Sequence, residues 1–295
     1  MTRLPQIAFL RDGRRLHLHD GPVDLIIEGK GNDSNVRAAY DAAIRRFSGL
    51  LDELCAELSE LRKAAHPTHC SLNGMVARRM HAAVAPFAAD CFITPMAAVA
   101  GSVAEEILGA MLAAAPLQRA YVNNGGDIAL HLRQGEYFTV GLMDRPEQYG
   151  PIHTMVIGAS APARGIATSG RHGRSFSLGI ADAVTVLARN ASKADAAATI
   201  IANAVDLPGH SAVLRCPANS LQPDSDLGPR LVTRHVGNLS DDDIAEALEA
   251  GAACARGLMG AGLIEGAALR LAGKTVVVEM RMIARQEPQF VFAMA

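Results

Sequence analysis

The amino-acid sequence predicts an α+β fold in which antiparallel-rich sheets carry packed helices. Short apolar stretches are joined by turns at Asp12-Gly13, at Asp20-Gly21 and within residues 123–127, as in strands connected by hairpins. Apolar residues recur at helical spacing over residues 36–61, and a nearly uniform apolar segment follows Pro95, which predicts two long helices. Several strands together with separate packed helices are typical of the α+β class.

The elements follow one another along the whole chain, and no repeat of fixed period interrupts them. The predicted strands cover residues 7–10, 16–19, 23–28, 119–123, 128–132, 137–142, 153–158, 164–168, 175–178, 182–187, 212–216, 231–236, 275–283 and 290–295. The predicted helices cover residues 36–61, 95–115 and 192–205, and another begins after Ser240. We expect a single domain over residues 1–295, with a division into two lobes left open.

Composition excludes several classes of protein. The chain has 295 residues, of which 49% are hydrophobic, enough for a large core. A net charge of -2, 4% aromatic residues and no tryptophan argue against a nucleic-acid-binding protein. The five cysteines have irregular spacing and predict no disulfide framework. We expect a small-molecule anionic ligand as a partner, and a second copy in a homodimer, since symmetric dimers are common.

No membrane-targeting segment is predicted. The first 31 residues lack the long apolar run of a signal peptide. Pro95 and Glu105-Glu106 interrupt the apolar segment between residues 91 and 118, which therefore predicts a buried helix rather than a membrane span. We accordingly expect a cytoplasmic protein with no membrane partner.

A glycine turn followed by basic side chains marks one half of a candidate ligand site within residues 163–205. The turn reads Thr168-Ser169-Gly170, and Arg171, His172 and Arg174 follow it. Glycine lets a backbone approach a ligand closely, and the basic side chains can meet an anionic group. An ordinary turn with solvated basic residues is the alternative, because Gly and Ser are common in turns.

Asp195 and Thr199 form the other half of the candidate site. They are four residues apart in the helix predicted to start at Ser192, so they share one helix face. A carboxylate beside a hydroxyl can hold a hard cation, and the free N–H groups of a helix start favour phosphate. The alternative is structural, since Ser192 to Asp195 also fits a capping box. The two halves together suggest a metal-assisted phosphate site.

Two other glycine-containing segments have both a structural and a functional interpretation. Gly101 lies in the apolar helix after Pro95 and would permit close approach of either a ligand or another backbone. Gly125 and Gly126 precede Asp127 in a turn between two strands. That turn is an ordinary hairpin signal, and as a ligand-facing loop it would present amides and one carboxylate.

Histidines occur in two patterns that raise the question of a metal. His17 and His19 would share a strand face, either as a two-histidine metal site or as an ordinary exposed face. His66, His69 and Cys70 in the motif HPTHC are zinc-ligand types, but no fourth ligand is evident. A capping loop with a buried thiol is the alternative.

Five motifs in a fixed order resemble one known family. They are TPMAAVAGSVAEEI (residues 94–107), VNNGGDI (122–128), IATSG (166–170), ADAVTVLA (181–188) and ADAAAT (194–199). The set resembles the ApbE-like superfamily, in the cytoplasmic branch of uncharacterised relatives of the FAD:protein FMN transferases. The resemblance covers residues 94–205, and it implies the ApbE-like fold.

The resemblance also implies ligands and residue roles. ApbE enzymes bind FAD and, with magnesium, transfer its FMN half to a Ser or Thr hydroxyl of a target protein. Carried over, Asp195, Thr199 and a backbone carbonyl near Ala97 would hold Mg²⁺. The resemblance together with the residue patterns assigns flavin binding to Gly101, Gly125, Gly126, Asp127, Thr168, Ser169, Gly170, Arg171 and Arg174.

Three departures from the family pattern bear on the chemistry. The family's Lys-Gly pair and Asp in the central helix are replaced by Ala100-Gly101 and Glu105, and the segment that carries the family's histidine is shortened. His172 is then the best replacement base, because it follows the glycine turn and titrates near neutrality.

These observations lead to three functional hypotheses. The first is a magnesium-dependent flavin-nucleotide protein with FMN transferase or pyrophosphate-cleaving activity. The second is a non-catalytic binding module for a flavin, a pterin or another anionic cofactor. The third is a structural relative in which Asp195 acts only as a helix cap.

Overall fold

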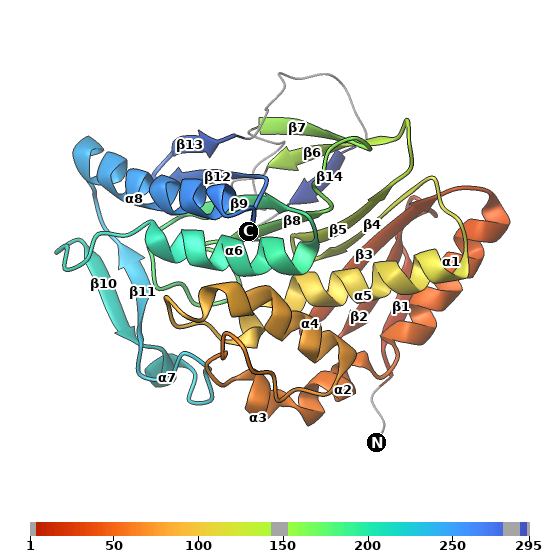
Figure 1. Ribbon diagram of the computed structural model, residues 1–295, viewed down its shortest axis with the longest axis horizontal. Helices are drawn as coiled ribbons and strands as arrows, with labels where there is room; N and C mark the ends of the chain where they lie inside the picture. Colours follow the sequence, from red (N-terminus) through yellow and green to blue (C-terminus); the bar gives the residue numbers. More distant parts are fainter. Residues whose placement is uncertain (1–3, 143–152, 280–289, 294–295) are drawn as a thin grey trace.

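The computed structural model describes residues 4–142, 153–279 and 290–293 (Figure 1). The described strands are β1 (Gln6–Phe9), β2 (Leu16–Asp20), β3 (Val23–Lys30), β4 (Arg119–Asn124), β5 (Asp127–Leu132), β6 (Tyr137–Leu142), β7 (His153–Gly158), β8 (Gly165–Ser169), β9 (Ala183–Ala188), β10 (Val213–Pro217), β11 (Leu231–Val236), β12 (Gly266–Leu271), β13 (Lys274–Val278) and β14 (Phe290–Ala293). The described helices are α1 (Asp33–Phe47), α2 (Leu50–Ala56), α3 (Leu58–Leu61), α4 (Met75–Val84), α5 (Val99–Ala114), α6 (Ala191–Ala204), α7 (Ala218–Leu221) and α8 (Asp241–Gly260), with 3-10 turns η1 (Ala85–Phe87) and η2 (Pro95–Ala98).

A long antiparallel sheet organises the described residues. Its nine described strands follow the order β1-β2-β3-β4-β5-β8-β9-β12-β13, and each neighbouring pair is antiparallel. Strand β2 illustrates why the sheet has two different faces. Leu16 and Leu18 are buried, whereas His17 and His19 between them are half-buried, as the two-residue period of a strand requires.

Helices cover one face of the long sheet and form the larger core. Figure 1 shows α5, α6 and α8 side by side across this face, with α4 packed on α5 and α6. Helix α5 contacts α1, α6, β4 and β5. Helix α5 and its preceding turn, Pro95–Ala114, are long and apolar enough to cross a membrane by length and composition alone. Half of this apolar stretch is nevertheless buried inside the protein. Its position is that of a core helix.

A smaller sheet covers part of the opposite face. Among the described residues it contains β14, β6 and β7. Phe138, Val140 and Met155 from this sheet pack against Tyr121 and Ile128 of the long sheet in a second apolar cluster. Mixed helices with antiparallel-rich sheets confirm the predicted α+β class.

The structure corrects several predicted elements. The helix expected over residues 36–61 is divided into α1, α2 and α3, because the backbone at Gly49 has φ of +82°, which a continuing helix cannot accommodate. Residues 175–178 form no strand, and the short helix α7 follows directly on β10. The C-terminal strands are β13 and β14, whereas residues 280–283 and 294–295 of the predicted strands lie outside the described residues.

Candidate functional site

The N-termini of α5 and α6 meet at the centre of the candidate site. Gly101 in the first turn of α5 lies against the backbone of α6, where a Cβ atom on Gly101 would stand only 2.3 Å from the Ala191 carbonyl oxygen. The close approach that the sequence suggested therefore involves a backbone at this point. The assignment of Gly101 to flavin binding stays a prediction.

Each of the two helices caps the other with a carboxylate. Asp195 Oδ2 of α6 accepts a hydrogen bond from the Gly101 N–H at 2.9 Å, and Glu105 Oε1 of α5 accepts one from the Ser192 N–H at 2.6 Å. A carboxylate at a helix N-terminus is favoured by the free amide donors and by the helix dipole. Glu105, a departure from the family pattern, therefore has a structural role at this junction.

The predicted capping box at Ser192 is wrong. Asn190 is the N-cap of α6, and its Oδ1 accepts a hydrogen bond from the Lys193 N–H at 3.1 Å. Asp195 reaches across to α5 instead of back to its own helix start. A cap supplied by another helix leaves no signature in the local sequence.

Asp127 brings a second carboxyl group to Asp195. It stands at the start of β5, and its Oδ1 accepts a hydrogen bond from the Thr168 N–H at 3.3 Å. Burial raises the pKa of Asp127 well above its ordinary value, and the charge of Asp195 raises it further. Burial also raises the pKa of Asp195, to about 7, against the hydrogen bonds from the Gly101 and Ala100 amides.

This carboxyl pair has the character of a cation site. Both residues keep part of their surface accessible, and no described Lys, Arg or His lies within ion-pair distance of either carboxyl. Two carboxylates without a nearby positive charge repel each other and resist ionisation. A divalent cation between them would offset the repulsion between the two carboxylates and favour the ionised form of each.

Thr199 and Ala97 lie on the same elements as this pair. Thr199 is one turn beyond Asp195 on α6 and is half-buried, and Ala97 belongs to the 3-10 turn before α5. Within the described ranges no group of three or more His, Cys, Asp and Glu side chains is arranged for a metal. A cation here would therefore need hydroxyl, carbonyl, ligand or water oxygens as well, which suits Mg²⁺.

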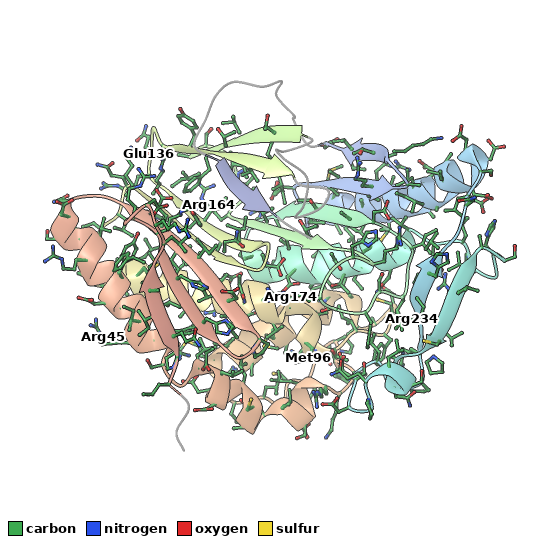
Figure 2. All side chains as sticks on the ribbon, turned by 180° about the vertical axis from the view of Figure 1, so that it is seen from behind. Arg45, Met96, Glu136, Arg164, Arg174 and Arg234 are labelled. Atoms are coloured by element: carbon green, nitrogen blue, oxygen red, sulfur yellow. The ribbon has the colours of Figure 1, made fainter. Side chains whose placement is uncertain are left out.

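The turn between β4 and β5 carries both of its glycines in conformations that other residues avoid. Gly125 has φ of +63° and Gly126 has φ of +113°, in the left-handed region that favours glycine. The Gly126 N–H donates to Asn123 Oδ1 at 2.8 Å. Arg174, labelled in Figure 2, brings its guanidinium to 3.7 Å from where a Cβ atom on Gly125 would lie.

The three basic residues after the glycine turn have different surroundings. Arg171 Nη2 lies 2.6 Å from Asp182 Oδ1, and His172 Nε2 lies 3.3 Å from the same oxygen. Arg174 is exposed, and its Nη1 atom donates a long hydrogen bond of 3.5 Å to the Pro22 carbonyl. Of the three, Arg174 is the side chain most available to an anionic ligand.

Asp182 is a functional-region residue that the sequence analysis missed. It is buried, and its Oδ2 accepts a hydrogen bond from the Ala272 N–H at 2.6 Å. Its carbonyl oxygen also lies 2.4 Å from where a Cβ atom on Gly170 would be. Sequence periodicity places Asp182 at the start of a predicted strand. The Ala-Asp-Ala motif around it is the sequence signal that could have identified Asp182 as part of the site.

Thr168 and Ser169 complete the turn on β8. Thr168 Oγ1 and Thr185 Oγ1 share a hydrogen bond at 2.9 Å, while the Thr168 amide contacts Asp127. Ser169 is half-buried at the end of the strand. The structure thus gathers Asp127, Thr168 and Asp195 in one place, and their roles toward a ligand stay predictions.

We expect the carboxyl pair to make stability depend on pH. Since the pKa of Asp195 is about 7 in the folded chain and 3.8 is its ordinary value, the folded protein holds protons between these values that the unfolded chain has lost. The free energy of unfolding should therefore fall as pH rises through this window. Magnesium needs the ionised pair, so it should raise the melting temperature more at pH 8 than at pH 6.

Thermal unfolding of the wild type and of Asp127→Asn, with and without magnesium, would measure this effect. The variant has one titrating carboxyl fewer, so its stability should fall less between pH 5 and pH 8. An equal magnesium-induced rise at both pH values would contradict the prediction.

Comparisons with known proteins agree with the motif order. The family model described as "AbpE bacteria" matches residues 7–277. The chain belongs to this family, as part of an uncharacterised branch of the ApbE-like superfamily. It is 40% identical over 183 residues to a UPF0280 protein of Methanopyrus kandleri, covering 61% of this chain and 69% of that protein.

Two further similarities complete the comparison. A UPF0280 protein of Archaeoglobus fulgidus is 36% identical over 141 residues, covering 47% of this chain and 54% of that relative. This match spans about half the length of the Archaeoglobus protein. The crystal structure of Pseudomonas stutzeri flavinyl transferase ApbE, apo form, is similar with a TM-score of 0.39 and 12% identity, over 93% of this chain and 94% of that one.

Proposed function

We propose that the protein binds a flavin nucleotide, FAD, through a magnesium ion at the junction of α5 and α6. The observation that carries the proposal is the pair Asp127 and Asp195, two carboxyls whose burial opposes ionisation, with the charge of Asp195 adding to the cost of ionising Asp127. A divalent cation stabilises such a pair. Membership of an ApbE-like family supports the flavin as the nucleotide.

The residues present suit a magnesium ion. Asp127 and Asp195 would supply charged oxygens, while Thr199 and the Ala97 carbonyl are the further oxygen ligands on α6 and η2. Mg²⁺ in proteins commonly takes one or two carboxylates, with the remaining positions filled by water and phosphate oxygens. The ion, when bound, would neutralise the charge of the nucleotide's pyrophosphate.

Arg174 is the residue we assign to the anionic part of the ligand. Its guanidinium lies beside the Gly125 turn and is exposed, whereas Arg171 is held in an ion pair with Asp182. Arg174→Ala should therefore weaken FAD binding by roughly tenfold or more, the usual effect of losing a hydrogen bond to a charged group.

Arg171→Ala is the control variant for the assignment of Arg174. It should mainly lower the melting temperature, because it leaves buried Asp182 without its guanidinium partner. Calorimetric titration with FAD and thermal unfolding of both variants would separate the two effects. A larger loss of affinity in Arg171→Ala than in Arg174→Ala would contradict the assignment.

We infer that binding is better supported than FMN transfer. Phosphoryl-type transfer requires charge neutralisation and an oriented nucleophile. The chain lacks the central lysine of the family pattern, and the Nε2 atom of His172 faces Asp182. In the neutral ring Nε2 would donate to Asp182 and leave Nδ1 as the basic atom, so His172 remains the candidate base if transfer occurs.

One experiment distinguishes the two activities. Mass spectrometry of ligands released from the purified protein, and calorimetry with FAD with and without magnesium, should reveal magnesium-dependent binding. Incubation with FAD, magnesium and a Ser/Thr acceptor peptide should yield little AMP or flavinylated peptide. Absence of magnesium-dependent binding would refute the proposed function, and rapid transfer undiminished in His172→Ala would refute both the binding-first proposal and the assignment of His172.

A further inference from the structure

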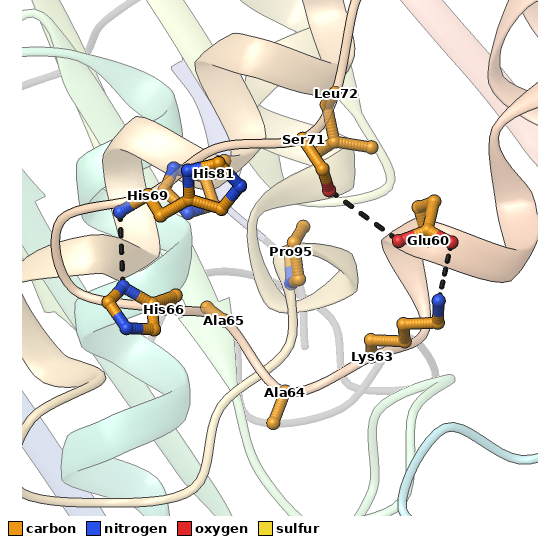
Figure 3. Close-up of a pocket in the computed structure, with 10 residues that line it drawn as sticks. All are labelled: Glu60, Lys63, Ala64, Ala65, His66, His69, Ser71, Leu72, His81 and Pro95. Atoms are coloured by element: carbon orange, nitrogen blue, oxygen red, sulfur yellow. Dashed lines mark hydrogen bonds and ion pairs between the residues drawn. The ribbon is translucent and has the colours of Figure 1, made fainter.

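A pocket outside the candidate flavin site lies among α3, the loop that follows it, α4 and the start of η2. Its volume is about 190 Å³, below the range typical of drug-sized ligands, so it suits only a small ligand. The residues that line it are Glu60, Lys63, Ala64, Ala65, His66, His69, Ser71, Leu72, His81 and Pro95 (Figure 3). None of them belongs to the candidate flavin site.

The hydrogen bonds of His66 define where its ring proton lies. His66 Nδ1 accepts hydrogen bonds from the Thr68 N–H at 3.2 Å and from the His69 N–H at 3.1 Å. A ring nitrogen that accepts is unprotonated, so the proton of the neutral ring is on Nε2. Metal-bound histidines instead use one nitrogen for the metal and donate with the other.

His66 is therefore a hydrogen-bond donor rather than a zinc ligand. The described residues also contain no metal-like cluster of His, Cys, Asp and Glu side chains. Cys70 of the same motif is exposed, so the buried thiol suggested by the sequence is wrong. His66 Nδ1 instead caps the turn that follows it, as the capping-loop alternative for the HPTHC motif expected.

His81 gives an independent indication that something polar occupies this pocket. The residue is 9% exposed, and its Nε2 atom is buried with no hydrogen-bond partner among the described residues. A buried polar atom without a partner costs free energy. His81 lines the pocket, so a ligand oxygen that reaches its Nε2 atom would remove that cost.

The charged and polar side chains that line the pocket indicate whether its ligand is an anion or a cation. Glu60 is the one carboxylate that lines it, and its charge is matched by an ion pair with Lys63. Glu60 also accepts a hydrogen bond from Ser71 at 3.5 Å. The remaining polar side chains are the imidazoles of His66, His69 and His81, whose ring N–H groups can donate hydrogen bonds.

We propose that this pocket binds a small oxyanion of phosphate size, held by His66, His69 and His81. The three imidazoles supply donors from two separate chain segments, the loop after α3 and helix α4. A phosphate group would offer acceptor oxygens to the N–H groups of these imidazoles. The group can be free inorganic phosphate or the phosphate of a small monoester.

The test uses inorganic phosphate, and then glycerol phosphate, on the full chain without magnesium at about pH 6.5, near the ordinary pKa of histidine. Imidazole ¹⁵N resonances and calorimetry report binding. We expect saturable shifts of His66, His69 and His81, and a loss of affinity of roughly tenfold or more in His81→Leu. Binding of both probes indicates the shared phosphate group, whereas binding of inorganic phosphate alone indicates the free ion.

Three variants keep the result interpretable. His69→Ala changes an exposed side chain and serves if His81→Leu fails to fold. His235→Ala, on exposed β11, should bind as the wild type does. Arg174→Ala should also retain the shifts, which separates this pocket from the flavin site. Shifts that do not saturate, affinity unchanged in His69→Ala and in any folded His81→Leu, or zinc binding without phosphate binding would overturn the proposal.

Discussion

Gly101→Ala is expected to lower the free energy of unfolding by about 3 kcal/mol, the upper part of the usual range for overpacking. The added Cβ would stand 2.3 Å from the Ala191 carbonyl oxygen and 2.8 Å from the Ser192 nitrogen. Both are backbone atoms, so α5 and α6 must separate. Separation also weakens the hydrogen bonds of Asp195 and Glu105 across the junction. The melting temperature should fall by roughly 5–10 °C.

Gly109→Ala is the matched control on the same helix. Gly109 is exposed, and a Cβ atom there would meet nothing within 4 Å. Alanine is the better helix former, so this variant should gain about 0.5–1 kcal/mol. Calorimetric unfolding of the two variants separates the effect of the α5–α6 backbone contact on stability from the effect of helix propensity. Equal melting temperatures would show that the α5–α6 contact is less tight than the structure has it.

The parts of the fold that the sequence predicted are those with local signals. The turn at residues 123–127 predicted the β4–β5 hairpin, and β7 and β11 have the expected bounds. Ser240 also caps α8 in a capping box with Asp243, as expected from the serine before an acidic run. In each case a few adjacent residues carry the whole physical cause.

The predictions that failed depended on longer segments. Apolar residues keep their helical spacing across Gly49, so periodicity alone gave no sign that the chain turns there between α1 and α2. Residues 175–178 resemble a strand in composition but form bends and irregular backbone. Their structure depends on distant partners, since Asn203 Oδ1 accepts a hydrogen bond from the Leu178 N–H.

The sequence predicted which residues belong to the candidate site, but it did not predict how they contact one another. Helical spacing placed Asp195 and Thr199 on one face of α6, and the family resemblance pointed to Asp127. Neither could reveal that Asp195 caps α5, because Gly101 is 94 residues away in the sequence. The same limit applies to Glu105 and Ser192, which are 87 residues apart. Contacts of this kind arise from the packing of whole elements.

Asp195→Asn is expected to weaken magnesium-dependent FAD binding by at least about 100-fold. Loss of a residue that merely supports a metal ligand typically costs 10–100-fold, so loss of a ligand charge should cost no less. Asparagine keeps an oxygen that can accept the Gly101 N–H, which preserves the cap on α5. It also removes the repulsion from Asp127. The variant should therefore fold at least as well as the wild type while losing the cation.

Glu105→Gln supplies the control for this prediction at the same helix junction. Glu105 caps α6 as Asp195 caps α5, and it contacts Arg79 at 3.3 Å rather than a second carboxyl. Removing its charge should leave magnesium-dependent binding within a few-fold of the wild type, because the Asp127–Asp195 pair remains intact. Calorimetric titration of the three proteins with FAD, with and without magnesium, provides the comparison. Unchanged binding in Asp195→Asn, or equal losses in the two variants, would reduce Asp195 to a helix cap and remove the proposed metal from this site.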